Sequence, residues 1–120
     1  MKERPEVKVV SDQIGSPTYA ADLAETILHV IDSLEKGNTH YGIYHYSNEG
    51  VISWYDFAMA IHNEEGLLCK VLPIPTSDYP TLAKRPAYSV MDKASLVKDF
   101  GISVKNWKES LDLCLSLLRQ

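Results

Sequence analysis

Short runs of β-branched and aromatic residues alternate along this chain with longer stretches of helical periodicity. Together they predict the following elements: strands at 7–10, 42–46, 70–74 and 87–91, and helices at 19–35, 54–65, 92–100 and 107–118. This alternation is typical of an α/β fold, here with three or four short strands and about four helices. A chain of 120 residues can bury one core, and a second independent domain does not fit.

Polar residues and prolines indicate where several of these elements begin. Thr18 is the candidate N-cap of the first helix, and Asn106 is the candidate N-cap of the last. Ser53 and Asp56 have the spacing of a capping box at the start of the second helix. Pro73 cannot donate to a sheet ladder, so we expect the strand that contains it to lie at a sheet edge.

Charge and hydropathy narrow the partners that this chain can have. Twelve Lys and Arg residues face sixteen Asp and Glu residues, which gives a net charge of −4 and argues against nucleic-acid binding. No apolar run approaches the roughly 18 residues of a membrane span, and no signal peptide is visible. Cys69 and Cys114 form no redox or zinc pattern, and we expect both to be small buried apolar residues. These features predict a cytoplasmic protein without a membrane partner.

The common catalytic and cofactor motifs are absent from these 120 residues. No two glycines are two positions apart, so the dinucleotide fingerprint is missing, and no Gly-Lys pair could form a P-loop. None of the seven tyrosines is followed by lysine four residues later, a pair that many reductases use as proton donor. We therefore assign no catalytic residue, no cofactor site and no metal site to this chain.

One candidate binding loop follows the first predicted strand, where open α/β sheets place their ligands. Gln13 offers hydrogen-bond donors and an acceptor, Gly15 permits a positive φ, and Thr18 precedes a helix N-terminus that could hold an anion. A simple capped turn explains the same residues equally well.

Two further loops follow predicted strands. In the loop at 75–86, which holds three of the six prolines, Arg85 offers a planar fork suited to phosphate or carboxylate. Arg85 could instead anchor its own loop to a backbone carbonyl or a nearby Asp, and Tyr79 is a weaker candidate for a sugar or base contact. The loop at 47–50 carries small polar residues, and we interpret the nearby Trp54 as a core anchor and Ser53 as a cap.

Several separated motifs together resemble one family. D-Q-I-G-S-P-T-Y (12–19), G-I-Y-H-Y-S-N-E-G (42–50), S-W-Y-D-F-A (53–58) and above all R-P-A-Y-S-V-M-D-K (85–93) are similar to dTDP-4-dehydrorhamnose reductase, an extended short-chain dehydrogenase. The resemblance runs in the same order from about Val7 to Leu118. It implies a partial Rossmann-like fold, a dTDP-sugar ligand, and NAD(P)H as cofactor of the full-length family. It also implies that the 12–18 loop and Arg85 lie on the substrate side.

The resemblance also implies what this chain lacks. The family's glycine motif and its Tyr-x-x-x-Lys pair both precede the matched region. We therefore expect residues 1–120 to form a single C-terminal substrate-binding domain without the N-terminal dinucleotide-binding domain, inactive alone. Some relatives dimerise through magnesium, but no carboxylate cluster here supports a magnesium site.

Two alternatives stay open. The chain could be a non-catalytic regulatory or interaction subunit, as in the related methionine adenosyltransferase regulatory subunit, or a free-standing small binding domain. For an isolated portion of a larger fold, open strand edges and uncovered apolar surface also predict self-association.

Overall fold

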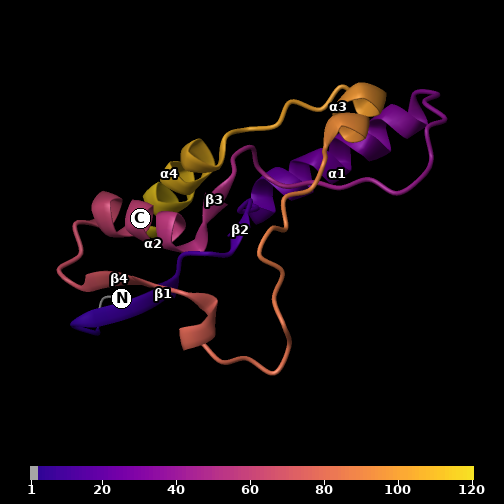
Figure 1. Cartoon of the computed structure of the whole chain (residues 1–120). Coiled ribbons are helices and arrows are strands. Elements are labelled where there is room, and N and C mark those ends of the chain that lie inside the picture. The colour runs from indigo at the N-terminus through magenta and orange to yellow at the C-terminus, as the bar shows by residue number, and fades with distance from the viewer. Residues whose placement is uncertain (1–2) are drawn as a thin grey trace.

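The computed structural model describes residues 3–120 and has the α/β fold that the sequence predicts (Figure 1). Its elements in chain order are β1 (Glu6–Val10), β2 (Ile14–Gly15), α1 (Ala20–Glu35), β3 (Ile52–Ser53), α2 (Trp54–Glu65), β4 (Lys70–Ile74), the short 3-10 helix η1 (Thr76–Asp78), α3 (Ala94–Phe100) and α4 (Trp107–Leu118). The four α-helices lie within two residues of the predicted positions, because their start and stop signals are local.

The strands form two small two-stranded sheets. β1 and β4 pair in parallel, with Glu6 opposite Lys70 and Val10 opposite Ile74. β2 and β3 pair antiparallel over only two residues each. The strands predicted at 7–10 and 70–74 are confirmed, and Pro73 lies in an edge strand as expected, since its sheet has two strands.

The strands predicted at 42–46 and 87–91 are wrong. Tyr44 and Tyr46 pack against a buried cluster of Leu96, Phe100 and Ile102, and their backbone joins no sheet. Tyr88 forms only an isolated parallel bridge with Ile14. Both segments have strand-like composition, but residues 42–46 join no sheet, and residues 87–91 meet β2 only at the Ile14–Tyr88 bridge, which is too short to form a ladder.

The helix starts show which predicted caps form. The Ser53 hydroxyl accepts from the Asp56 backbone N–H at 3.0 Å and the Asp56 carboxylate accepts from the Ser53 N–H at 2.9 Å, so the capping box is confirmed. Asn106 caps α4 through the Lys108 N–H at 2.9 Å, also as predicted. The prediction for Thr18 is wrong, because α1 begins one residue later and Tyr19 occupies the N-cap position.

The elements gather at two ends of an elongated molecule. α2 packs against β1, β4 and α4 at one end, and α1 packs against α3 at the other (Figure 1). The radius of gyration is 17.2 Å, whereas a compact domain of this length would have about 14 Å. The chain therefore leaves more surface uncovered than a closed single core would.

Much of that surface belongs to α1. Leu23, Ile27 and Ile31 recur at steps of four residues along one face of the helix and are 36%, 49% and 48% exposed. The buried positions are instead Asp22 and Thr26, on another face. We call Leu23, Ile27 and Ile31 the open face of α1.

Both cysteines are free; Cys69 is buried as expected, whereas Cys114 is only partly buried. No helix in residues 3–120 is long and apolar enough to cross a membrane.

Candidate functional site

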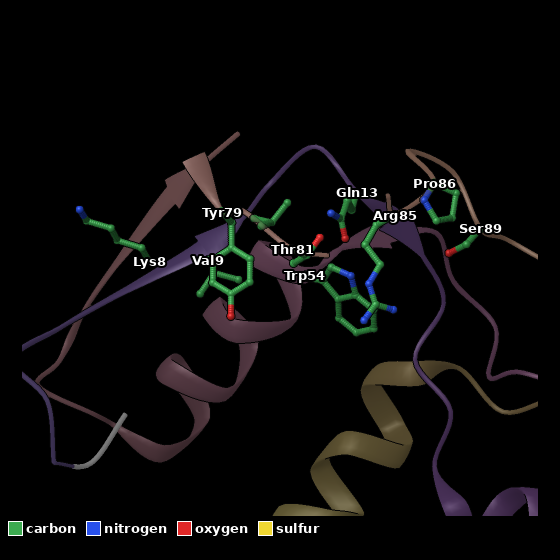
Figure 2. Close-up of a pocket in the computed structure, with 10 residues that line it drawn as sticks. Lys8, Val9, Gln13, Trp54, Tyr79, Thr81, Arg85, Pro86 and Ser89 are labelled. Carbon is green, nitrogen blue, oxygen red and sulfur yellow. The ribbon is translucent and has the colours of Figure 1, made fainter. Parts of the chain in front are cut away.

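A pocket of about 510 Å³ opens beside β1 and the first turn of α2 (Figure 2). Its lining is drawn from segments far apart in the sequence: Lys8, Val9, Val10, Gln13, Trp54, Tyr79, Thr81, Arg85, Pro86 and Ser89. Three of the five candidate residues, Gln13, Tyr79 and Arg85, are brought together here. The lining includes two cations and no Asp, Glu, His or Cys. It suits an anionic ligand with an apolar or aromatic part.

Gln13 reaches the pocket from the turn that follows β1. Its side chain is half-buried, and its Nε2 donates to the Thr76 hydroxyl at 3.3 Å. The next residue, Ile14, pairs with Ser53 in β3 and bridges Tyr88. The amide of Gln13 is therefore presented from a backbone that is held on two sides.

Tyr79 and Arg85 come from the exposed segment that follows β4. Tyr79 is 55% exposed and lies just after η1. Arg85 makes no hydrogen bond or ion pair with any other part of the described chain, so the guanidinium does not act there as an anchor for its own loop. Both side chains are directed into the pocket in Figure 2. Arg85 is the strongest anion-binding group of the lining, because its guanidinium has a delocalised charge and five N–H donors.

Trp54 is a pocket residue that the sequence interpretation missed. The expectation that it anchors the core is wrong, because its side chain is 49% exposed and lines the pocket. Trp54 is the first residue of α2, and the Ser53–Asp56 capping box fixes the backbone on which it stands. No sequence signal marks it as a pocket residue, because the strand before it, β3, has only two residues and forms by pairing with the distant β2.

Gly15 and Thr18 lie outside the main lining. A Cβ on Gly15 would be 2.7 Å from the Ser89 hydroxyl oxygen, so this glycine permits a close approach between the 12–18 loop and the segment before α3. Thr18 is exposed and lines a separate hollow of about 140 Å³ that also includes Trp107.

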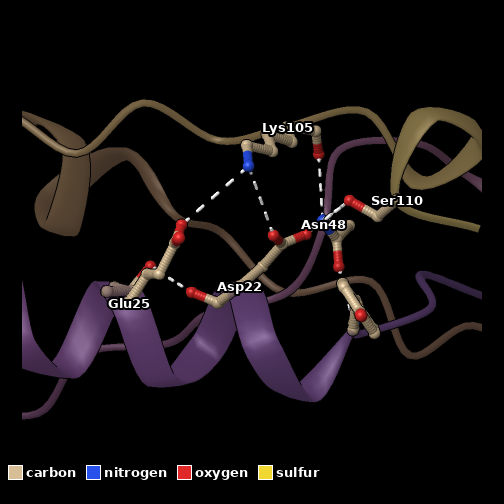
Figure 3. A network of polar contacts seen from close by, with 7 residues as sticks. Asp22, Glu25, Asn48, Lys105 and Ser110 are labelled. Atoms are coloured by element: carbon tan, nitrogen blue, oxygen red, sulfur yellow. Dashed lines mark hydrogen bonds and ion pairs between the residues drawn. The ribbon is translucent and has the colours of Figure 1, made fainter. Parts of the chain in front are cut away.

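A buried polar network joins the start of α1 to α4 (Figure 3). The Asn48 side chain, 1% exposed, donates to the Asp22 carboxylate at 2.7 Å, to the Ser110 hydroxyl at 3.1 Å and to the Lys105 carbonyl at 3.2 Å. Its oxygen accepts from the Tyr19 backbone N–H at 2.7 Å. Ser110 also donates directly to Asp22. One asparagine thus links three segments that are distant in sequence.

The network keeps a buried carboxylate ionised. Burial alone would raise the pKa of Asp22, but hydrogen bonds from Ser110 and Asn48 and the charge of Lys105, 3.6 Å away, hold the pKa below its ordinary value. On the other side of the 47–50 loop, the buried Lys93 ammonium donates to the Asn48 carbonyl at 3.1 Å. The loop after residue 46 is therefore a structural junction.

The turn between β1 and α1 does not fit the diphosphate of a nicotinamide cofactor. The turn between β1 and α1 has a single glycine, Gly15, and the Ser89 side chain fills the space beside it. A dinucleotide cradle needs free backbone N–H groups and room for a diphosphate at that place. For metals, no cluster of three or more His, Cys, Asp or Glu side chains occurs anywhere between residues 3 and 120.

Comparison with known proteins identifies the family. The family model described as "RmlD substrate binding domain" matches residues 1–120. The dTDP-4-dehydrorhamnose reductase of Aggregatibacter actinomycetemcomitans is 44% identical over 118 residues, covering 92% of this chain and 40% of that protein.

Two solved structures have the same fold. The crystal structure of a dTDP-4-dehydrorhamnose reductase from Clostridium acetobutylicum superimposes with a TM-score of 0.90 at 42% identity, covering 99% of this chain and 41% of that one. A dTDP-4-dehydrorhamnose reductase from Bacillus anthracis, solved in complex with NADP, gives a TM-score of 0.80 at 40% identity over 92% of this chain and 37% of that one. The chain thus spans about 40% of the length of the relatives it matches. It belongs to the RmlD substrate binding domain family.

Proposed function

We propose that this chain is the sugar-nucleotide-binding portion of a dTDP-4-dehydrorhamnose reductase. The observation that carries the proposal is the single pocket lined by Gln13, Trp54, Tyr79 and Arg85 in a chain of the RmlD substrate binding domain family. None of these side chains is a neighbour of another in sequence. Their convergence on one pocket fits a binding role better than a role in packing.

The chemistry of each group suits one part of a dTDP-sugar. The Arg85 guanidinium can form paired hydrogen bonds with the diphosphate, and the exposed Lys8 ammonium adds a second positive charge to the same lining. The faces of Trp54 and Tyr79 can stack on the base or the sugar ring. The Gln13 side-chain oxygen can accept a hydrogen bond from a sugar hydroxyl, while the bond from its nitrogen to Thr76 holds the amide in place.

In the whole reductase, hydride would pass from NAD(P)H to the C4 ketone of dTDP-4-keto-6-deoxy-mannose, giving dTDP-L-rhamnose. The NADP complex of the Bacillus anthracis relative supports this cofactor. The missing glycine motif and Tyr-x-x-x-Lys pair support a division of labour in which other parts of the reductase hold the cofactor and supply the acid. This chain would orient the substrate and exclude water, and would be inactive alone. The two free cysteines are consistent with a cytoplasmic reductase.

A chimera tests this proposal. Residues 1–120 would replace the matching 40% of the Aggregatibacter actinomycetemcomitans reductase, and NADPH oxidation would be measured with dTDP-4-keto-6-deoxy-mannose. We expect turnover by the chimera and none by the 120-residue chain. The same chimera carrying Arg85→Ala should show a KM raised about tenfold or more, since a charge-assisted bidentate contact is lost. A chimera that binds NADPH but does not reduce the keto-sugar would contradict the proposal.

The open face of α1 favours a second candidate, an interaction subunit on the same scaffold. Leu23, Ile27 and Ile31 lie in a row at helical spacing and remain exposed. In this reading the chimera would fold and remain without turnover, and substitutions on α1 would abolish binding to a protein partner while Arg85→Ala would not. In the leading proposal, the same α1 surface packs against the remainder of the reductase.

A further inference from the structure

The turn at residues 12–14 makes hydrogen bonds to both ends of the segment that carries Tyr79 and Arg85. At one end, Asp12 binds Thr76. At the other, the Ile14 N–H donates to the Ala87 carbonyl at 2.8 Å, and the Ser89 N–H donates to the Ile14 carbonyl at 2.8 Å. Gln13, which lies between these two contact residues, lines the pocket. The 12–14 turn therefore sets where the segment from residue 76 to residue 89 leaves and rejoins the fold.

The contact between Asp12 and Thr76 is made by the Asp12 carboxylate. The two carboxylate oxygens accept from the Thr76 backbone N–H at 2.9 and 3.1 Å, and one of them also accepts from the Thr76 hydroxyl at 2.5 Å. Hydrogen bonds from the Thr76 hydroxyl and backbone hold the pKa of Asp12 below its ordinary value. The carboxylate therefore stays ionised, which is the form that binds both donors most strongly.

The same contact orients Gln13. The Thr76 hydroxyl gives its only proton to Asp12, so it faces Gln13 as an acceptor and receives the Gln13 Nε2–H at 3.3 Å. The Gln13 oxygen is left as an acceptor on the pocket side. A carboxylate that is not part of the lining thus fixes the hydrogen-bonding polarity of a residue that is.

Between the contacts at Thr76 and those at Ala87 and Ser89, few interactions hold the segment to the rest of the chain. Residues 77–89 are all exposed, and Pro80 and Pro86 limit the number of backbone shapes it can take. A stiff segment with fixed ends presents its side chains in one place, whereas release of one end lets Tyr79 and Arg85 swing away together. The Ile14 end is held by two backbone bonds and by a 3.3 Å bond from the Ser89 hydroxyl to the Ile14 carbonyl. The Thr76 end is held through the Asp12 side chain, so it is the end that one substitution can release.

We propose that Asp12 is a positioning residue: by holding Thr76 it fixes the place of Tyr79 and Arg85 and the orientation of Gln13 in the pocket. The effect on ligand affinity rests on the function proposed above, while the effect on the segment itself does not. The two effects can therefore be measured separately on the 120-residue chain.

The test combines hydrogen–deuterium exchange over residues 76–86 with calorimetric titration of dTDP. In Asp12→Ala we expect exchange at the Thr76 amide to quicken about tenfold, and dTDP affinity to fall about five- to tenfold. Thr76→Ser keeps both contacts and should behave as the unaltered chain. Thr76→Val keeps only the backbone contact and should lie between the two.

Asp92→Asn is the matched control. Asp92 also accepts from a backbone N–H, that of Ala94 at 2.8 Å, but at the start of α3 and outside the pocket lining. We expect this variant to leave exchange over residues 76–86 and dTDP affinity unchanged.

Each outcome decides a different point. Unchanged exchange in Asp12→Ala would refute the claim that Asp12 holds the segment. Faster exchange with unchanged dTDP affinity would refute its role in positioning the pocket residues. If the unaltered chain binds no dTDP, the proposed function fails, and the exchange result still decides whether Asp12 holds the segment.

Discussion

Replacing Asn48 with alanine should cost this chain a large share of its stability. The Asn48 side chain is 1% exposed and makes four hydrogen bonds, to Tyr19, Asp22, Lys105 and Ser110. The substitution removes them and leaves the partners buried with fewer bonds. This loss, unlike a cavity in an apolar core, involves a buried carboxylate.

The magnitude follows from the kind of bond that is lost. A hydrogen bond to a charged group such as Asp22 contributes about 1.5–3 kcal/mol, and a neutral one contributes about 1 kcal/mol. The Asn48 amide has two protons for three acceptors, so about two neutral bonds add to the charged one. We expect a loss of about 3.5–5 kcal/mol. Domains of this size unfold with roughly 5–15 kcal/mol in total.

Urea denaturation followed by circular dichroism measures this loss as a shift of the midpoint at constant slope. Asn63→Ala is the control, because Asn63 is exposed on α2, and its replacement should change the free energy of unfolding by about 0.5 kcal/mol or less. A loss below about 1 kcal/mol in Asn48→Ala, with an unchanged slope, would refute the reasoning that the network holds α1, the 47–50 loop and α4 together.

Three further predictions concern packing, pH and association. Gly15→Ala should destabilise the chain by about 1 kcal/mol or less. The new Cβ would lie 2.7 Å from the Ser89 hydroxyl oxygen, and this exposed hydroxyl can rotate away at the loss of its 3.3 Å hydrogen bond to the Ile14 carbonyl. In a chain that carries Ser89→Ala, Gly15→Ala should have almost no effect in urea titrations, and an equal loss in both chains would contradict the proposed clash. Folding lowers the pKa of Asp22, so the ionised carboxylate contributes its full stability above the ordinary pKa of 3.8, and this contribution is lost as the pH falls toward the lowered pKa. Asp22→Asn should flatten this part of the stability–pH curve. An unchanged curve would show that other carboxylates cause the loss of stability in acid. The open face of α1 should make the chain self-associate, which light scattering would measure. Ile27→Asp, at a side chain 49% exposed, should favour the monomer without lowering stability. A strictly monomeric unaltered chain at high concentration would contradict the expectation.

The sequence predicts the helices of this fold well and its strands less well. Helix ends depend on residues close in sequence, such as Ser53 with Asp56 or Asn106 with Lys108, so their spacing is visible before the fold is known. A strand needs a neighbour, and composition does not supply one. Tyr44 has a strand-like setting, yet its ring packs edge-on against Phe100 with centroids 5.2 Å apart.

The pocket shows the same division between local and distant information. Gln13, Tyr79 and Arg85 can be proposed from residue chemistry and from their place after predicted strands. The exposure of Trp54 could not be, since an aromatic residue at the start of an amphipathic helix usually packs inward. Nor could the Asp12–Thr76 contact, because its partners are 64 residues apart and only the parallel pairing of β1 with β4 brings them together.

Binding of dTDP tests the central claim most directly. Isothermal titration of the 120-residue chain with dTDP should show saturable binding at one site. Arg85→Ala should weaken that binding about 10- to 100-fold, because a charge-assisted contact with the diphosphate is lost, and Arg85→Lys should restore only part of it. Absence of binding by a folded chain, or equal affinity of the unaltered chain and Arg85→Ala, would contradict the claim that this pocket receives the sugar nucleotide.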